Sequence, residues 1–381
     1  MKKFTKKRYF RTAICFGVGA VLLTAAVFAN YDNANGYSVC KGALKGLLFE
    51  TNFTADHHVE MKLDGQTVAS NKGRYMTNGG GNPKRYNYDE NAQRYSLDEE
   101  LQIDIHEMIQ QDGKSIDTYT EPDGTKWSYS YEDYEPTVNG SVVEEEDGSI
   151  IGRRGSVVEK AINFGETLCD TLVGDLKNSF ILTEEKEGIR TYNVSLTGSQ
   201  MPDLVSSGTS LLVSTMREGI EQTRRERLEH PEYYEDYMSL DDLLYDNLFS
   251  GGDPIIENLD GVMAVNEQGL PTLLHGVLTV TGFDGNGQGH SLELLVHIDL
   301  SEYGTTQIQH KSMDEFPNLM INTSNGGMRF VLNTEASEED QQKVMERAKE
   351  YASYGNTIVV IDQNGNEYAR IQGEDTEALE D

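Results

Sequence analysis

The sequence is poor in basic residues, cysteine, proline and tryptophan. Its 381 residues include 32 Lys and Arg against 64 Asp and Glu, three cysteines, eight prolines and one tryptophan. Six of the basic residues lie within the first twelve positions, so the rest of the chain carries 26 basic residues against 64 acidic ones. Such a surface repels nucleic-acid phosphates and anionic lipid headgroups. We therefore do not expect the protein to bind nucleic acid.

Sequence signatures of catalysis are also missing. The chain has no GxSxG serine motif, no GxxxxGK[ST] phosphate loop and no HExxH pair. The adjacent histidines His57 and His58 lack metal-ligand spacing, and neighbouring strand residues point to opposite faces. Four more histidines are scattered through predicted strands, His106, His275, His290 and His297. We therefore predict no catalytic residue, no cofactor and no metal site, in a protein that is not an enzyme.

A membrane segment determines where the chain works. Residues 1–12 form a basic flank, and residues 13–29 (AICFGVGAVLLTAAVFA) are apolar and uncharged. This run is either a transmembrane signal anchor or a signal peptide cleaved near Ala29. In both cases the positive flank stays in the cytoplasm. We expect the remaining chain to lie outside the cytoplasm, as a single-pass protein of the cell membrane or as a secreted one.

Two cysteines follow this segment, Cys40 and Cys169. Outside the cell they can form a disulfide. The alternative, which we favour, is two buried thiols that act as small hydrophobic residues.

Residues 30–36 read as a linker, and 37–310 as one α+β domain. A helix is predicted over 37–48, and a second has Val158, Leu172 and Leu176 on one face. Period-two runs predict an antiparallel sheet with strands at 58–63, 67–76, 101–110, 114–120, 125–131, 190–197, 259–266, 270–283 and 290–300. The strand LELLVHIDL is almost continuously apolar, which predicts a central position.

The turn between the last two of these strands contains Asp284, Asn286 and Gln288, which suggests a calcium loop. Such a loop needs a glutamate at its twelfth position, where Leu295 stands. We therefore predict a hairpin turn.

The first strands are rich in tyrosine, and they also hold the single tryptophan, Trp127. One interpretation is a platform for carbohydrate or peptide. The other, which we favour, is aromatic pairing between neighbouring strands.

Two further segments complete the chain. Residues 217–247 are a charged, helical, acidic insertion, which is either a partner-binding protrusion for an envelope protein or a solvated helical hairpin. Residues 311–372 predict a C-terminal β-α-β-β extension with a helix at 337–354, and residues 373–381 a disordered acidic tail.

The order of elements resembles one bacterial family. A membrane signal, the helix YSVCKGALKGLLFE, the hairpin NFTADHHVEMKLDGQTVASNKGRYM, a central helix and the strands from NLDGVMAV to LELLVHIDLSEYG follow one another over about 37–310. This arrangement is similar to the lipoprotein-carrier superfamily, the LolA-like and LppX-like proteins. The lipid-attachment cysteine of anchored members is absent, and 217–247 and 311–381 have no counterpart.

The resemblance implies an α+β fold in which a curved antiparallel β-sheet, an unclosed barrel, carries helices packed on its concave face. It also implies a hydrophobic cavity, for which Leu172 and Leu176 are the candidate lining residues; the alternative is that they belong to an ordinary core.

We therefore expect a non-enzymatic extracytoplasmic protein that binds a lipid-like or other hydrophobic ligand or senses the cell envelope. One alternative is a structural or protein-interaction module of the envelope with a fully packed core. A further alternative is a wall-associated hydrolase.

Overall fold

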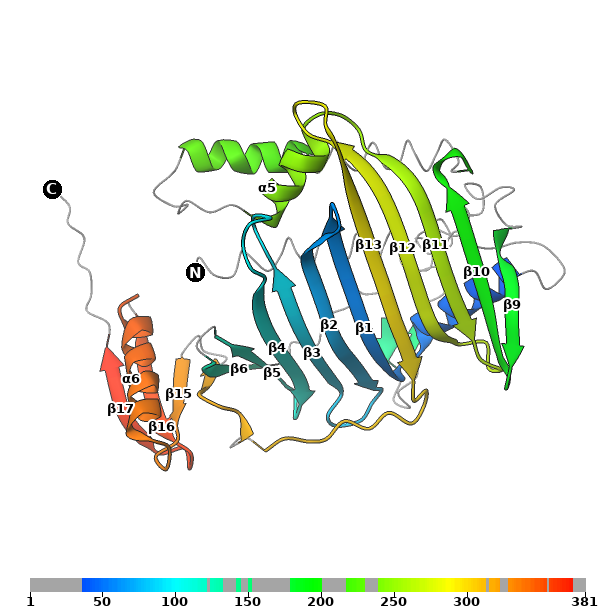
Figure 1. Cartoon of the computed structure of the whole chain (residues 1–381). Helices are drawn as coiled ribbons and strands as arrows, with labels where there is room; N and C mark the ends of the chain where they lie inside the picture. The colour runs from blue at the N-terminus through cyan, green and yellow to red at the C-terminus, as the bar shows by residue number, and fades with distance from the viewer. Residues whose placement is uncertain are drawn as a thin grey trace.

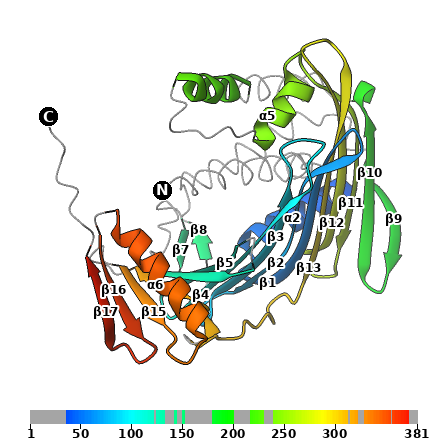
Figure 2. The same ribbon diagram turned by 60° about the vertical axis from the view of Figure 1, so that its left-hand side comes forward.

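The computed structural model describes residues 36–121, 124–132, 142–144, 150–152, 179–200, 217–229, 239–312, 315–322, 328–354 and 356–372. Within these residues a large, curved, unclosed sheet of 15 strands is accompanied by few helices (Figures 1 and 2). Residues 13–29, Cys169, Leu172, Leu176 and 373–381 lie outside the described part. No helix in the described part is long and apolar enough to span a bilayer.

Along the chain, the main sheet consists of a first meander (β1 to β6), a second meander (β9 to β13) and a C-terminal group (β14 to β17). The strands are β1 (Asn52–Leu63), β2 (Gln66–Asn78), β3 (Arg85–Gln93), β4 (Gln102–Gln111), β5 (Lys114–Thr120), β6 (Lys126–Glu132), β9 (Ile181–Lys186), β10 (Ile189–Thr197), β11 (Ile255–Val265), β12 (Pro271–Phe283), β13 (Gly289–Ser301), β14 (Leu319–Asn322), β15 (Met328–Leu332), β16 (Thr357–Asp362) and β17 (Glu367–Gln372). Two short strands, β7 (Val142–Glu144) and β8 (Ile150–Gly152), pair separately.

The helices are α2 (Gly36–Phe49), an unlabelled helix over 217–229, α5 (Leu240–Leu244) with a π-helical turn (Tyr245–Phe249), and α6 (Glu338–Ala352). A 3-10 turn, η3 (Gly198–Gln200), follows β10. Ser337 caps α6 by accepting a hydrogen bond from the Asp340 backbone N–H.

The strand order is β17-β16-β15-β14-β6-β5-β4-β3-β2-β1-β13-β12-β11-β10-β9. In this order every neighbouring pair in the part of the sheet that runs from β6 through β1 and β13 to the edge strand β9 is antiparallel, as predicted. The pairs β14–β6 and β15–β16 are parallel. The sheet is therefore mixed. The apolar strand β13 lies between β1 and β12, which confirms its predicted central position. The 284–289 segment is a hairpin turn in which Gly287 has a φ of 80°.

The concave face of the sheet carries the helices (Figure 2). Cys40 and Leu44 of α2 pack against Leu274 and Leu300, so α2 covers β12 and β13. The leucines of α5 pack against Leu63 of β1 and Leu292 of β13, at the opposite end of the sheet strands from α2. At the C-terminal edge, α6 packs its apolar face on β15 and β16. The predicted placement of helices on the concave face is confirmed for these elements.

The C-terminal strands continue the main sheet because the chain after β13 crosses its convex face. Ile308 and Phe316 of this crossing segment pack against Ile109 and Ile116 of β4 and β5. The Lys311 ammonium donates to Glu107 at 3.1 Å. The crossing brings β14 alongside β6, a strand almost 200 positions earlier in the chain.

Ile116 gives a test of this crossing contact. Its side chain is 1% exposed, so Ile116→Ala should lower the free energy of unfolding by about 2–5 kcal/mol through lost burial and a residual cavity. Ile103 on the neighbouring strand is 60% exposed, and Ile103→Ala should change stability by less than about 0.5 kcal/mol. Urea unfolding followed by circular dichroism measures both; equal effects would contradict the packing.

Candidate binding surface on the concave face

The concave face is divided into an apolar and a polar half. Its apolar half centres on Val59, Leu294 and Val296, with Leu278 and Ile298 against them, and we call these five residues the apolar strip. Val59 is 5% exposed and Val296 is 1% exposed. Among the described residues this cluster contains only strand side chains, from β1, β12 and β13.

The strip lies between two helix-covered clusters. Ile298 also packs with the α2 cluster, and Met61, which borders the strip, also packs with the α5 cluster. The three clusters are therefore continuous along β1 and β13. Cys40, in the first cluster, is a free buried thiol, and burial raises its pKa to about 12. The expectation of a buried thiol is confirmed for Cys40.

The polar half begins on the next strands. We call His57, Asp89, His106, Asp117 and Tyr131 the polar row. His57 Nε2 lies 3.3 Å from Asp89 Oδ1, and His106 Nδ1 lies 4.0 Å from Asp89 Oδ2. His106 Nε2 lies 3.2 Å from Asp117 Oδ1, and the Tyr131 hydroxyl donates to Asp117 Oδ2 at 2.6 Å. The row thus crosses the sheet from β1 to β6.

Gly73 allows this row to form. Asp89 is two strands away from His57, with Gly73 of β2 between them in the register. A Cβ added at Gly73 would lie 2.8 Å from His57 Cε1 and 2.1 Å from the Tyr88 carbonyl oxygen. The absence of a side chain on β2 is therefore what lets the His57 ring cross that strand.

Asparagine side chains surround Asp89. The Asn71 amide donates to Asn91 Oδ1 at 2.7 Å and to Asp89 Oδ1 at 3.3 Å, and the Asn87 amide also donates to Asp89. Burial alone would raise the pKa of Asp89, but hydrogen bonds from His57, Asn71 and Asn87 outweigh it and lower that pKa. Asp89 is accordingly an ionised carboxylate in a partly buried polar site.

Aromatic side chains continue the row toward the C-terminal strands. Tyr119 stacks on His106 with ring centroids 4.5 Å apart and meets Tyr129 edge-on at 5.8 Å. The Arg347 guanidinium of α6 lies 5.3 Å from the Trp127 ring centroid. The Tyr119–Tyr129 contact is aromatic pairing between neighbouring strands, as predicted, whereas the Arg347–Trp127 contact joins α6 to β6.

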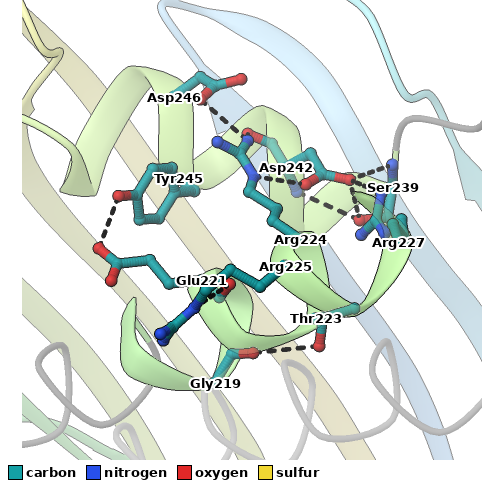
Figure 3. A network of polar contacts seen from close by, with 10 residues as sticks. All are labelled: Gly219, Glu221, Thr223, Arg224, Arg225, Arg227, Ser239, Asp242, Tyr245 and Asp246. Carbon is teal, nitrogen blue, oxygen red and sulfur yellow. Dashed lines mark hydrogen bonds and ion pairs between the residues drawn. The ribbon is translucent and has the colours of Figure 1, made fainter. Parts of the chain in front are cut away.

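The 217–247 insertion includes α5, and the helix over 217–229 of the same insertion packs against α5. Figure 3 shows Arg224 and Arg227 of the 217–229 helix pointing at the Asp242 carboxylate, at 2.8 and 2.7 Å. Asp242 also closes a capping box with Ser239 at the start of α5. Arg224 lies 4.4 Å over the Tyr245 ring. The 217–229 helix is therefore held on α5 by two arginine side chains that both bind the buried Asp242 carboxylate.

The predicted site residues have different outcomes. Leu172 and Leu176 fall outside the described residues. His57 and His58 point to opposite faces, as expected for adjacent strand positions. Among the residues that the structure describes, no group of three or more His, Cys, Asp or Glu is placed to hold a metal ion.

Sequence reasoning missed most of the polar row and the asparagines around it. The signal that could have found them is the run Asn87-Tyr88-Asp89-Glu90-Asn91, where amides and a carboxylate recur with period two. This alternation is that of a strand with a polar inner face.

Comparisons with known proteins give a match among solved structures. No protein-family model matches the chain, and no curated protein matches it. Among solved structures, it is similar to LprF from Mycobacterium bovis at 10% sequence identity, over 74% of this chain and 99% of that one, with a TM-score of 0.27.

The Asp242 cluster predicts an acid-sensitive contact. Burial would raise the pKa of Asp242, but hydrogen bonds from Ser239, Arg224 and Arg227 lower it to about 2. A depressed carboxylate pKa adds stability above the ordinary pKa near 4, and this stability is lost as the pH falls toward 2. Asp242→Asn should lower the free energy of unfolding by roughly 1–3 kcal/mol at pH 7.

The difference between wild type and Asp242→Asn should shrink when urea unfolding is repeated at pH 5, 4, 3 and 2. Asp246→Asn is the matched control, because Asp246 contacts the same Arg224 at 2.9 Å with a side chain that is about half exposed. Its effect should stay below about 1 kcal/mol. A difference for Asp242→Asn that is constant with pH would contradict the assignment.

Proposed function

We propose that the protein is a non-enzymatic extracytoplasmic binding protein, anchored in the cell membrane or secreted through residues 13–29, whose concave sheet face holds a lipid-like ligand. The observation that carries the proposal is the apolar strip. The inner face of the sheet is apolar over three adjacent strands; Val59, Leu294 and Val296 at its centre are shielded from solvent, whereas Leu278 and Ile298 beside them are half-buried and would meet the ligand.

The arrangement of the two halves supports an amphiphilic ligand. Leu294, Val296 and Ile298 alternate along β13 over about 13 Å, enough to line part of an extended acyl chain. At the end of the strip His57 pairs in register with Ile298 and begins the polar row. A ligand with its tail on the strip would thus place its polar head against hydrogen-bonding groups that already face inward.

The polar row supports binding over hydrolysis. Within the described residues its hydrogen bonds join histidine, aspartate, asparagine and tyrosine, and include no serine or cysteine that an adjacent base would activate. The envelope-interaction alternative requires that the protein's own side chains cover the strip. The low exposure of Val59, Leu294 and Val296 favours this alternative, so the experiments below must distinguish the two.

The first test is direct. Residues 31–381, purified without detergent, should carry a stoichiometric apolar molecule on native mass spectrometry, or take up a fluorescent fatty acid. A protein with the mass of the bare chain and no uptake would overturn the proposal and favour a packed envelope module.

The second test uses neighbouring positions of β12. Leu278→Gln should weaken uptake of the fluorescent fatty acid roughly tenfold or more, because a buried leucine contributes about 1.5–3 kcal/mol. Val277→Gln is the matched control, since Val277 is also half-buried but faces the convex side. Equal loss in both variants would show that the fatty acid does not bind on the strip.

A further inference from the structure

Three histidines lie side by side on the convex face, away from the strip. In the strand register His58 of β1 is opposite His297 of β13, and His297 is opposite His275 of β12. Side chains directly opposite on neighbouring strands point to the same face and come into contact. His275 and His297 are 22 positions apart on the two strands of one hairpin, whereas His58 lies more than 200 positions earlier and reaches them through the pairing of β1 with β13.

The two histidines of β12 and β13 have the geometry of a chelating pair. His275 Nδ1 lies 3.4 Å from His297 Nδ1, and the ring planes are inclined by 67°. Two nitrogens bound to one tetrahedral Zn²⁺ at about 2.0–2.1 Å are about 3.3–3.4 Å apart. Small rotations of the rings, with the proton of His275 moved from Nδ1 to Nε2, would bring both lone pairs onto one ion.

Asp299 sets the tautomer that such a site needs. His297 Nε2 lies 3.0 Å from Asp299 Oδ2, and an ionised carboxylate only accepts hydrogen bonds. His297 therefore carries its proton on Nε2 and presents an unprotonated Nδ1 toward His275. A histidine that donates to a carboxylate while its other nitrogen binds the ion is the usual arrangement around protein-bound zinc.

The charge of the protein also favours a bound cation. A metal ion competes with a proton for the imidazole lone pair, so binding requires neutral rings. The net charge of −32 also attracts cations to the surface.

We propose that His275 and His297 bind a divalent transition-metal ion of the Zn²⁺ type through their Nδ1 atoms, with Asp299 orienting His297. Two protein nitrogens leave the other coordination positions to water or to a donor atom of a small ligand. Imidazole ligands suit Zn²⁺, Ni²⁺ and Cu²⁺, whereas Mg²⁺ and Ca²⁺ prefer oxygen. This site and the strip lie on opposite faces of the sheet. An experiment can therefore show that metal binding is absent without testing lipid binding, and the reverse.

The experiment is a calorimetric titration of the full-length protein with Zn²⁺, in excess Mg²⁺ so that surface carboxylates are occupied. One saturable site is expected in the wild type. His275→Gln and His297→Gln should each weaken it at least tenfold, and Asp299→Asn roughly tenfold, as for other residues that orient a metal-binding histidine. Zn²⁺ should also raise the melting temperature of the wild type but not of His297→Gln.

His310 is the matched control, because it lies 2.9 Å from Asp112 in another exposed histidine–aspartate pair. His310→Gln should leave the affinity within twofold of wild type. His58→Gln distinguishes a two-nitrogen from a three-histidine site, and a tenfold loss there would overturn the two-nitrogen assignment. Zn²⁺ affinity unchanged in His297→Gln, or lost equally in His310→Gln, would overturn the proposal as a whole.

Discussion

The pairing of β1 with β13 is the contact on which the rest of the structure depends. It joins the first meander to the second, from Thr54 opposite Ser301 to Leu63 opposite Leu292. Because side chains alternate between faces, this register decides what every residue of both strands meets. A slip of one residue would move the strip to the convex face and place charged side chains under α2 and α5.

The same register explains why the two sites lie back to back. Val59 meets Val296 on the concave face, and one position earlier His58 meets His297 on the convex face. His57, one further position back, turns inward again and opens the polar row across Gly73. Three consecutive residues of β1 thus belong to the polar row, the histidine group and the apolar strip. The alternation of side chains along the strand is enough to separate them.

Much of this fold could be predicted from the sequence because most strands alternate or are continuously apolar. The strand β13 shows its central position in its composition alone. β3 was missed for a physical reason: its inward residues are Asn87, Asp89 and Asn91, which satisfy one another by hydrogen bonds and leave no apolar period to detect. β14 is four residues long and exists through its parallel pairing with β6, which no local pattern encodes.

The candidate sites were harder to predict than the fold, because each is assembled by register. His106, His275 and His297 are visible in the sequence as scattered histidines, and only strand order determines that two of them meet and the third pairs with carboxylates. Leu172 and Leu176 were chosen from helical periodicity, which reports an apolar face and not what it contacts. The strip, in contrast, lies on β1, β12 and β13, three strands that the sequence predicts.

The two ends of the strip are closed by different forces, and this bears on how a ligand would enter. α2 is fixed by apolar contacts with β12 and β13, which salt and moderate pH changes affect little. At the other end α5 is also fixed by leucines, but the 217–229 helix above it is held by two arginines on the Asp242 carboxylate. Charge pairs with half-exposed arginines weaken with ionic strength, whereas buried leucines do not. The α5 end therefore has an outer layer, the 217–229 helix, whose ion pairs weaken with salt, whereas the leucine contacts of α5 beneath it do not.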